Sequence, residues 1–173
     1  MKVNTNSWNK IRYTIYAPIY NVIRGVFDNS RAKSIANLNC QPGDKVLIVG
    51  AGTGLDIPYL PKGVQITATD ITPAMVTKII ALATNLKLDV EAKVMDGQNL
   101  DFGNEHFDHV ILHLLLAVIP NPKLCIQEVD RVTKKGGSVA VFDKFIKPNS
   151  TLTAWRKIGN GITTFLFSDI TRD

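Results

Sequence analysis

Residues 45–63 read KVLIVGAGTGLDIPYLPKG, an apolar run followed by glycines at positions 50, 52 and 54. A buried strand that ends in a glycine-rich loop is typical of parallel α/β sheets, in which cofactors bind at the carboxyl ends of the strands. The stretch therefore predicts a fold class and a ligand-binding loop. The residues around it decide which ligand the loop holds.

The rest of the chain repeats this alternation of apolar runs and segments with helical periodicity. Helices are expected to fill most of the intervals, and proline at a first helical position marks two of them, from Pro73 to about residue 86 and from Pro122 to Val132. Such alternation predicts an α/β domain built on a parallel sheet. The strands predicted after the first lie near residues 65–69, 90–94, 107–112 and 138–142.

Three kinds of ligand suit a strand followed by a glycine loop. A phosphate-binding P-loop needs a lysine followed by Ser or Thr, and GAGTGLD has neither. A dinucleotide loop needs G-x-G-x-x-G, but here the third glycine comes one position early and Leu55 takes its place, so a nicotinamide cofactor is the weaker alternative. A nucleoside without phosphates fits best. Asp70, at the end of the next strand, can accept hydrogen bonds from two ribose hydroxyls, and Asp96 is placed for an adenine amine.

Length and composition indicate one globular domain over residues 1–173. A chain of this length can bury a single core, and 45% apolar with 20% charged residues is ordinary for a folded protein. The first residues lack the apolar stretch of a signal peptide, so we expect a cytoplasmic location, with peripheral contact at the inner membrane face. Cys40 and Cys125 have no partners at metal-ligand spacing and are expected to be reduced thiols, with neither a disulfide nor a metal site.

The N-terminal segment carries all of the excess positive charge. Residues 1–35 hold six Lys or Arg and one acidic residue, which accounts for the net charge of +5 of the whole chain. Within this segment, residues 8–27 show helical periodicity, a break at Pro18 and a wide apolar surface. The segment either packs as a cap over the domain or acts as a lid. A helical lid of residues 1–40 would close an active site and contact an anionic membrane through residues 8–33.

Five motifs in order resemble those of class I S-adenosylmethionine-dependent methyltransferases, over about residues 10–170. They are VLIVGAGTGLDIPYL, ATDITPAMV, MDGQNLDF, FDHVILHLLLAVIPNP and EVDRVTKKGGSVAVFD. The resemblance implies a Rossmann-like three-layer sandwich with a mostly parallel sheet in the order 3-2-1-4-5, lacking the last two strands. It implies S-adenosylmethionine as cofactor, with the glycines at its methionine part. The cofactor-binding residues expected in this way are Gly50, Ala51, Gly52, Gly54, Asp70, Ile71, Met75, Asp96, Gly97 and His113.

The segment YAPIYNVIRGVFDNSRAKSIA narrows the resemblance. It is similar to the lid region of bacterial phosphatidylethanolamine N-methyltransferases and, less closely, of quinone-biosynthesis C-methyltransferases. The similarity implies an enzyme that methylates a small or lipid-like acceptor, such as a phospholipid head-group amine. Two alternatives stay open: an RNA methyltransferase, because a basic arm also suits phosphate backbones, and a truncated cofactor-binding protein without catalysis. Apolar periodicity in the arm favours lipid over nucleic acid.

His113 and Tyr16 are the candidate catalytic residues. Methyl transfer is a one-step displacement, so the protein acts mainly by aligning the acceptor and excluding water. An amine acceptor must lose a proton, and we predict His113 for this step. By family analogy Tyr16, with Tyr13 and Tyr20, borders the sulfonium or the acceptor. The alternative for His113 is a pocket-lining or core residue whose ring bonds a backbone carbonyl.

The resemblance also implies an unusual end of the sheet. Most members of the family continue beyond strand five with two further strands, and this chain reaches Asp173 before them. We therefore expect strand five to be an open edge, which favours pairing with a second copy of the chain as a homodimer.

Overall fold

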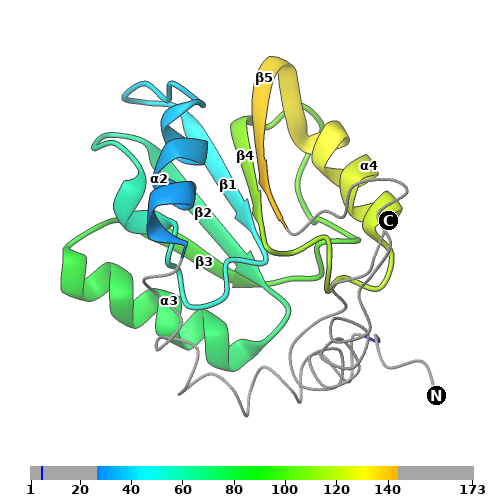
Figure 1. The fold of residues 1–173 in the computed structure, drawn as a ribbon, viewed down its shortest axis with the longest axis horizontal. Helices are drawn as coiled ribbons and strands as arrows, with labels where there is room; N and C mark the ends of the chain where they lie inside the picture. The colour runs from blue at the N-terminus through cyan, green and yellow to red at the C-terminus, as the bar shows by residue number, and fades with distance from the viewer. Residues whose placement is uncertain (1–4, 6–26, 144–173) are drawn as a thin grey trace, which may run out of the picture.

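Five parallel strands form the centre of the molecule in the computed structural model, which describes residue 5 and residues 27–143. The strands lie in the order β3-β2-β1-β4-β5 (Figure 1). The predicted fold class and strand order are confirmed. The strands are β1 (Lys45–Val49), β2 (Gln65–Asp70), β3 (Val90–Val94), β4 (Phe107–His113) and β5 (Thr133–Phe142).

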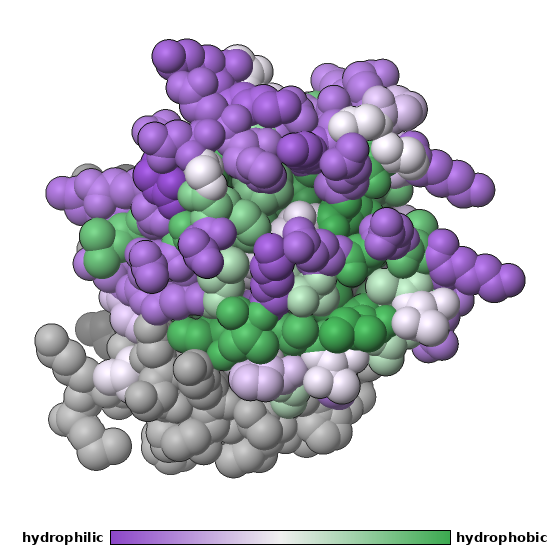
Figure 2. All heavy atoms as spheres, turned by 180° about the vertical axis from the view of Figure 1, so that it is seen from behind, coloured by the Kyte–Doolittle hydropathy of each residue, from purple (hydrophilic) through white to green (hydrophobic). Residues whose placement is uncertain are grey.

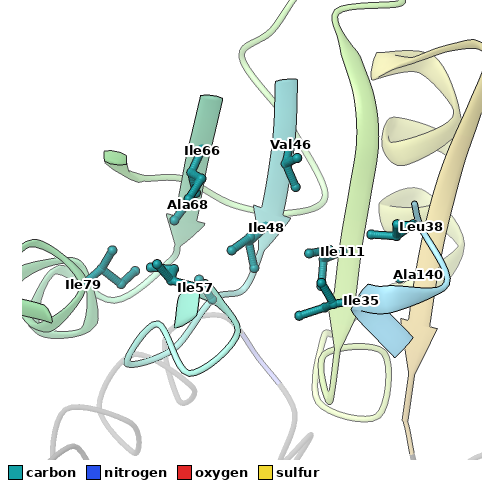
Figure 3. Close-up of a cluster of buried hydrophobic side chains, with 11 residues drawn as sticks. Ile35, Leu38, Val46, Ile48, Ile57, Ile66, Ala68, Ile79, Ile111 and Ala140 are labelled. Atoms are coloured by element: carbon teal, nitrogen blue, oxygen red, sulfur yellow. The ribbon is translucent and has the colours of Figure 1, made fainter. Parts of the chain in front are cut away.

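Helices pack on both faces of this sheet and make a three-layer sandwich. On one face Ile35, Ile57 and Ile79 pack with the inward side chains of the strands, as Figure 3 shows. On the other face Cys125 and Val129 pack on apolar side chains of β1 and β4. The elements that supply these residues are α2 (Asp28–Ala36), the 3-10 helix η2 (Ile57–Tyr59) and α3 (Pro73–Leu86) on the first face, and α4 (Pro122–Val132) on the second.

Burial along the strands follows their place in the sheet. Residues 46–49 of the central strand β1 are at most 1% exposed because side chains on both faces are covered. A parallel strand covered on both faces reads as a continuous apolar run, which is why VLIV could be recognised from the sequence. The edge strand β3 has no buried residue, and Val94 is 52% exposed.

Helix ends are set by local chemistry. The side chain of Asn121 accepts a hydrogen bond from the Leu124 N–H, and Pro122 follows at the first helical position of α4. The helix α3 ends at Leu86 and is capped by Lys87, whose backbone is left-handed (φ 54°) and whose N–H donates to the Thr84 carbonyl in the last turn. Both helices have the bounds predicted from the sequence, from Pro73 to Leu86 and from Pro122 to Val132.

Two intervals between strands hold no α-helix, contrary to the expectation that helices fill most of them. Between β1 and β2 the described chain forms only η2, because Pro58, Pro61 and Gly63 interrupt any longer helix. Residues 95–106, between β3 and β4, form turns and a short bridge.

Arg131 holds the second of these intervals in place. Its guanidinium donates to the carbonyls of Leu100 and Phe102, each at 2.7 Å, and to the Glu128 carboxylate at 2.8 Å. Glu128 in turn accepts a hydrogen bond from the Leu100 N–H at 2.8 Å. These bonds satisfy backbone groups that a helix would satisfy internally, so the loop is ordered by contacts with α4.

Strand β5 begins earlier than predicted. It starts at Thr133, directly after α4, whereas the sequence pattern placed its start at residue 138. Phe107 pairs with Thr133, but the next pair is His109 with Ser138, so residues 134–137 form an irregularity in the ladder. Gly136 there has a φ of 78°, which favours glycine. Gly136 and Gly137 thus lie within β5.

The surface away from the viewer of Figure 1 is mixed. Hydrophilic residues dominate the upper part of that face, and hydrophobic residues gather in a band across its lower half (Figure 2). At the β5 edge Val139 and Val141 are more than 40% exposed.

Within the part of the chain that the structure describes, no helix has the length and apolarity that a membrane crossing needs. Cys40 and Cys125 are free thiols.

Residues 8–26 of the helix expected over residues 8–27, and with them the N-terminal part of the expected lid, lie outside the described residues. The same holds for residues 144–173.

Candidate active site

The glycine loop after β1 has a backbone that favours glycine. Gly50, Gly52 and Gly54 all have positive φ angles, between 58° and 83°. A Cβ on Gly50 would lie 2.6 Å from Cδ1 of Leu115, so a side chain there would displace Leu115 from the wall of the pocket described below. Gly54 faces the core instead of the pocket, because a Cβ there would meet Ile57 and Leu82. Two of the three glycines therefore face the pocket, and the third permits close packing.

Asp70 connects the glycine loop to the start of α3. Its Oδ2 accepts a hydrogen bond from the Gly52 N–H at 2.9 Å, and its Oδ1 accepts one from the Thr72 N–H at 2.8 Å. Burial raises the pKa of this carboxyl, and the two backbone N–H groups only partly offset that effect. Through one carboxylate, Asp70 therefore holds both the glycine loop and Thr72, which is the N-cap residue of α3.

A pocket opens at the carboxyl ends of the strands, where parallel topology brings the loop, Asp70 and His113 together. Nine of the ten residues predicted to bind the cofactor line this pocket, and Gly54 does not. Nine further residues in its wall complete the site together with Leu114, the residue that follows β4. The nine are Arg31, Thr53, Leu55, Asp56, Met95, Leu115, Val118, Ile119 and Pro120.

Asp96 and Gly97 form the part of the pocket wall that follows β3. The Asp96 carboxylate accepts hydrogen bonds from the backbone N–H and the side-chain amide of Gln98, both at 3.0 Å. Gly97 is buried, and a Cβ on it would lie 2.8 Å from Cγ1 of Val49. Only glycine lets this turn approach β1 so closely, and that approach sets the position of Asp96.

His113, the last residue of β4, has both ring nitrogens bonded to side chains. Its Nδ1 lies 2.7 Å from Oδ1 of Asp56, and its Nε2 lies 3.0 Å from Oγ of Ser34. A carboxylate only accepts, so Nδ1–H donates to Asp56, and in the neutral ring Nε2 accepts the Ser34 hydroxyl proton. The predicted alternative of a bond to a backbone carbonyl is replaced by this side-chain network.

Asp56 receives a second donor, the Arg31 guanidinium, whose Nη1 lies 2.7 Å from the same oxygen. Burial alone would raise the pKa of Asp56, but His113 and Arg31 outweigh it and lower that pKa below its ordinary value. Sequence reasoning missed Arg31, Ser34 and Asp56 as site residues. Asp56 offered the one usable signal, an acidic residue two positions after the glycine loop.

Tyr16 and its neighbours Tyr13 and Tyr20 lie outside the described residues, so their placement beside the pocket stays a prediction. Among the residues that the structure does describe, no cluster of His, Cys, Asp or Glu has the geometry of a metal site.

A family model described as a methyltransferase domain matches residues 47–141, from within β1 to within β5. The chain belongs to the methyltransferase domain family. The matched region is more than half of the chain and contains the glycine loop, Asp70, Asp96 and His113.

Relatives that the chain matches in sequence are named as methyltransferases. The chain is 33% identical over 134 residues to a phosphatidylethanolamine N-methyltransferase of Cereibacter sphaeroides, covering 76% of this chain and 66% of that protein. It is 27% identical over 148 residues to a demethylmenaquinone methyltransferase of Paenarthrobacter aurescens, covering 82% of this chain and 56% of that protein. This methyltransferase-family chain thus spans just under two thirds of the length of the first relative and about half of the second.

Solved structures share the fold. The [4+2]-cyclase SpnF superposes with a TM-score of 0.76 at 21% identity, covering 83% of this chain and 62% of that one. At this level of identity the likeness shows the fold alone and carries no statement about the reaction.

Proposed function

We propose that this chain binds S-adenosylmethionine and transfers its methyl group to a small or lipid-like acceptor. Membership of the methyltransferase domain family supports the reaction class. The observation that carries the proposal is Asp70, a carboxylate 8% exposed in the pocket wall, held at the end of β2 by the Gly52 and Thr72 N–H groups. A buried carboxylate of this kind suits the two hydroxyls of a ribose.

The residues of the pocket fit this cofactor from end to end. Asp70 takes the ribose, Asp96 and the turn at Gly97 take the adenine, and the backbone at Gly50 and Gly52 takes the methionine part. Ala51, Ile71 and Met75 supply apolar contacts in the same wall. The bound cofactor supplies an electrophilic methyl group, so the chain needs no nucleophile of its own and acts by alignment and exclusion of water.

Proton removal from an amine acceptor is assigned to His113 in this proposal, with Tyr16 beside the methyl group. Both ring nitrogens of His113 are bonded, so a proton would reach the ring through the Ser34 hydroxyl on its Nε2 side. The hydroxyl would pass its own proton to Nε2 and take the proton of the acceptor. Asp56 would then stabilise the charged imidazolium.

The proposed acceptor is a phospholipid head-group amine. Two observations support it: the name of the Cereibacter sphaeroides relative and the basic, apolar character of residues 8–33. In this proposal residues 1–40 form a lid, the protein works at the inner membrane face from the cytoplasm, and the exposed edge of β5 pairs with a second copy. Radioactive methyl transfer to phosphatidylethanolamine vesicles tests the acceptor. Transfer to RNA, with none to vesicles, would contradict it.

Calorimetric titration of S-adenosylmethionine and its demethylated product tests the cofactor. The Asp70→Ala variant should lose at least about tenfold in affinity, because a buried acceptor of two hydrogen bonds is removed. Asp89→Ala, at an exposed carboxylate before β3, is the matched control and should bind as the wild type does. Equal binding by all three chains would show that Asp70 does not hold the cofactor.

A second candidate is a cofactor-binding protein without catalysis. The observation that favours it is the partial coverage of the named methyltransferases, because an acceptor site elsewhere in those proteins would have no counterpart in this chain. Tight cofactor binding combined with no methyl transfer to vesicles, quinones or thiols would select this candidate.

A further inference from the structure

Arg31 places a buried guanidinium in the wall of the pocket. The residue is 6% exposed, lies on α2 and is the sole Lys or Arg among the described residues that line the pocket. Three carboxylates, those of Asp56, Asp70 and Asp96, share the wall with it. Among the described residues, the pocket wall therefore combines one cationic side chain with three carboxylates in a largely apolar lining.

A network of side chains holds this cation in place. Asp56 Oδ1 binds Nη1 of Arg31 and Nδ1 of His113, each at 2.7 Å, and His113 Nε2 binds the Ser34 hydroxyl at 3.0 Å. Ser34 lies one turn after Arg31 on the same helix, so the contacts form a closed circuit between α2, the loop after β1 and the end of β4. The guanidinium is therefore fixed before any ligand arrives.

Arg31 nevertheless keeps hydrogen-bonding capacity. A guanidinium has five N–H donors, and among the described residues only Nη1 is bonded. Its Nε is buried and has no hydrogen-bond partner in that part of the chain. The remaining Nη donors are therefore the ones that an anion in the pocket would meet, and such an anion would satisfy a guanidinium that is under-bonded in this part of the chain.

We propose that Arg31 binds the carboxylate of the amino-acid part of S-adenosylmethionine. The inference rests on the proposed function, which brings that cofactor to the pocket. Arg31 is bonded to Asp56, two residues after Gly54, so it stands at the glycine-loop end of the pocket. Asp70 and Asp96 would repel a carboxylate and suit the nucleoside instead. A planar guanidinium matches a carboxylate in shape and charge.

One consequence concerns the basic N-terminal segment. Arg31 is one of the six basic residues that carry the excess charge of the chain, yet it is buried beside the pocket. Its charge is directed to the cofactor, so it does not contribute to an anionic surface contact. Ser34, Asp56 and His113 act as positioning residues for it.

The test compares two ligands that differ by this one group. Calorimetry measures the affinities of S-adenosylmethionine and of decarboxylated S-adenosylmethionine for the full chain, for Arg31→Met and for Arg31→Lys. Lys33→Met, at an exposed cation on the same helix, is the matched control. We expect wild type to bind the carboxylated ligand about 10- to 100-fold more tightly, the range for a charged hydrogen-bonded pair.

Arg31→Met should remove this preference by weakening only the carboxylated ligand, and Arg31→Lys should retain part of it. Unchanged affinity for the decarboxylated ligand also shows that the pocket of the variant is folded. Equal loss for both ligands, or no loss for either, would overturn the assignment and leave the proposed cofactor intact. If Arg31→Met does not fold, a wild-type chain that binds both ligands equally overturns it too. A wild-type chain that binds neither ligand overturns the proposed function itself, and the inference with it.

Discussion

At the scale of single residues, the carboxylates of this pocket differ through their neighbours. Asp70 is buried, it accepts hydrogen bonds from the Gly52 and Thr72 N–H groups, and burial raises its pKa. Asp56 is buried as well, but the His113 ring and the Arg31 guanidinium lower its pKa. The first carboxylate keeps acceptor capacity for a ligand, whereas the second is committed to holding other side chains.

Replacing Asp56 by Asn is expected to destabilise the fold by about 3–5 kcal/mol at pH 7, because the buried Arg31 charge loses its counter-ion. Chemical denaturation in urea measures this loss. Asp101→Asn, at an exposed carboxylate, should change the free energy of unfolding by no more than about 0.5 kcal/mol. A loss below 1 kcal/mol in the Asp56 variant would mean that the network does not hold α2 in place.

The pH dependence of that loss has a defined sign. The folded-state pKa of Asp56 is lowered, so its stabilising contribution is complete above the unfolded pKa of about 3.9 and disappears as the pH falls through the folded value. The difference between wild type and Asp56→Asn should thus stay constant from pH 7 to about pH 5 and shrink below pH 4. Denaturation curves at several pH values check this, and a difference that does not shrink at all below pH 4 would contradict it.

At the scale of elements, the ends of neighbouring strands are aligned by register. Asp70 pairs with Val94, and Ile48 pairs with Ile111, so the loops after β1, β2, β3 and β4 begin at one level. Close packing of these loops then shapes the pocket. One such close approach is at Gly97, where an added Cβ would lie 2.8 Å from Val49 and 3.3 Å from Ile119.

Gly97→Ala should therefore destabilise the fold by about 1–3 kcal/mol, because the added methyl group overpacks the contact with β1. Gly103→Ala is the matched control from the same loop, since a Cβ there meets nothing within 4 Å. Thermal and urea unfolding of both variants give the comparison. If the two variants unfold alike, the turn at Gly97 adjusts more freely than its contacts indicate. We also expect weaker cofactor binding in Gly97→Ala alone, because Asp96 precedes the displaced residue.

At the scale of the whole molecule, the pocket is lined by residues from both helical layers and from the sheet between them. Arg31 reaches it from the α2 side of the sheet, and Val118 and Ile119 reach it from the loop that leads into α4. A ligand in this pocket contacts residues from all three layers, so it should stabilise the domain as a unit.

The demethylated product at a hundred times its dissociation constant should raise the free energy of unfolding by about 2.7 kcal/mol. For a chain of this size the melting temperature rises by about 5–10 °C. Scanning calorimetry or fluorescence unfolding measures the rise, and Asp70→Ala should show at most about half of it, because a tenfold weaker affinity leaves about 1.4 kcal/mol at the same ligand concentration. The same rise in both chains would place the ligand away from Asp70.

Much of the fold was predictable because its signals are local. The apolar run before Gly50, the prolines at the starts of α3 and α4, and the acidic residues Asp70 and Asp96 after strands are all recognisable within a few positions. Parallel strands bring their carboxyl ends to one edge, so these local signals also predicted which residues meet in the pocket. A residue in the loop after a strand, or at the end of a strand, is placed at this edge of the sheet by its local sequence, without a contact to a distant part of the chain.

The remaining features depend on contacts between distant parts of the chain. Ser34 and His113 are 79 positions apart, and Arg31 and Asp56 are 25 apart, yet each pair is hydrogen-bonded. No periodicity links such residues, because the packing of α2 on the sheet alone brings them together. The order of residues 95–106 likewise depends on Arg131 in α4. Spacing along the chain therefore determined the strands, the glycine loop and the positions of Asp70 and Asp96, whereas tertiary packing decided where the buried cation of Arg31 lies.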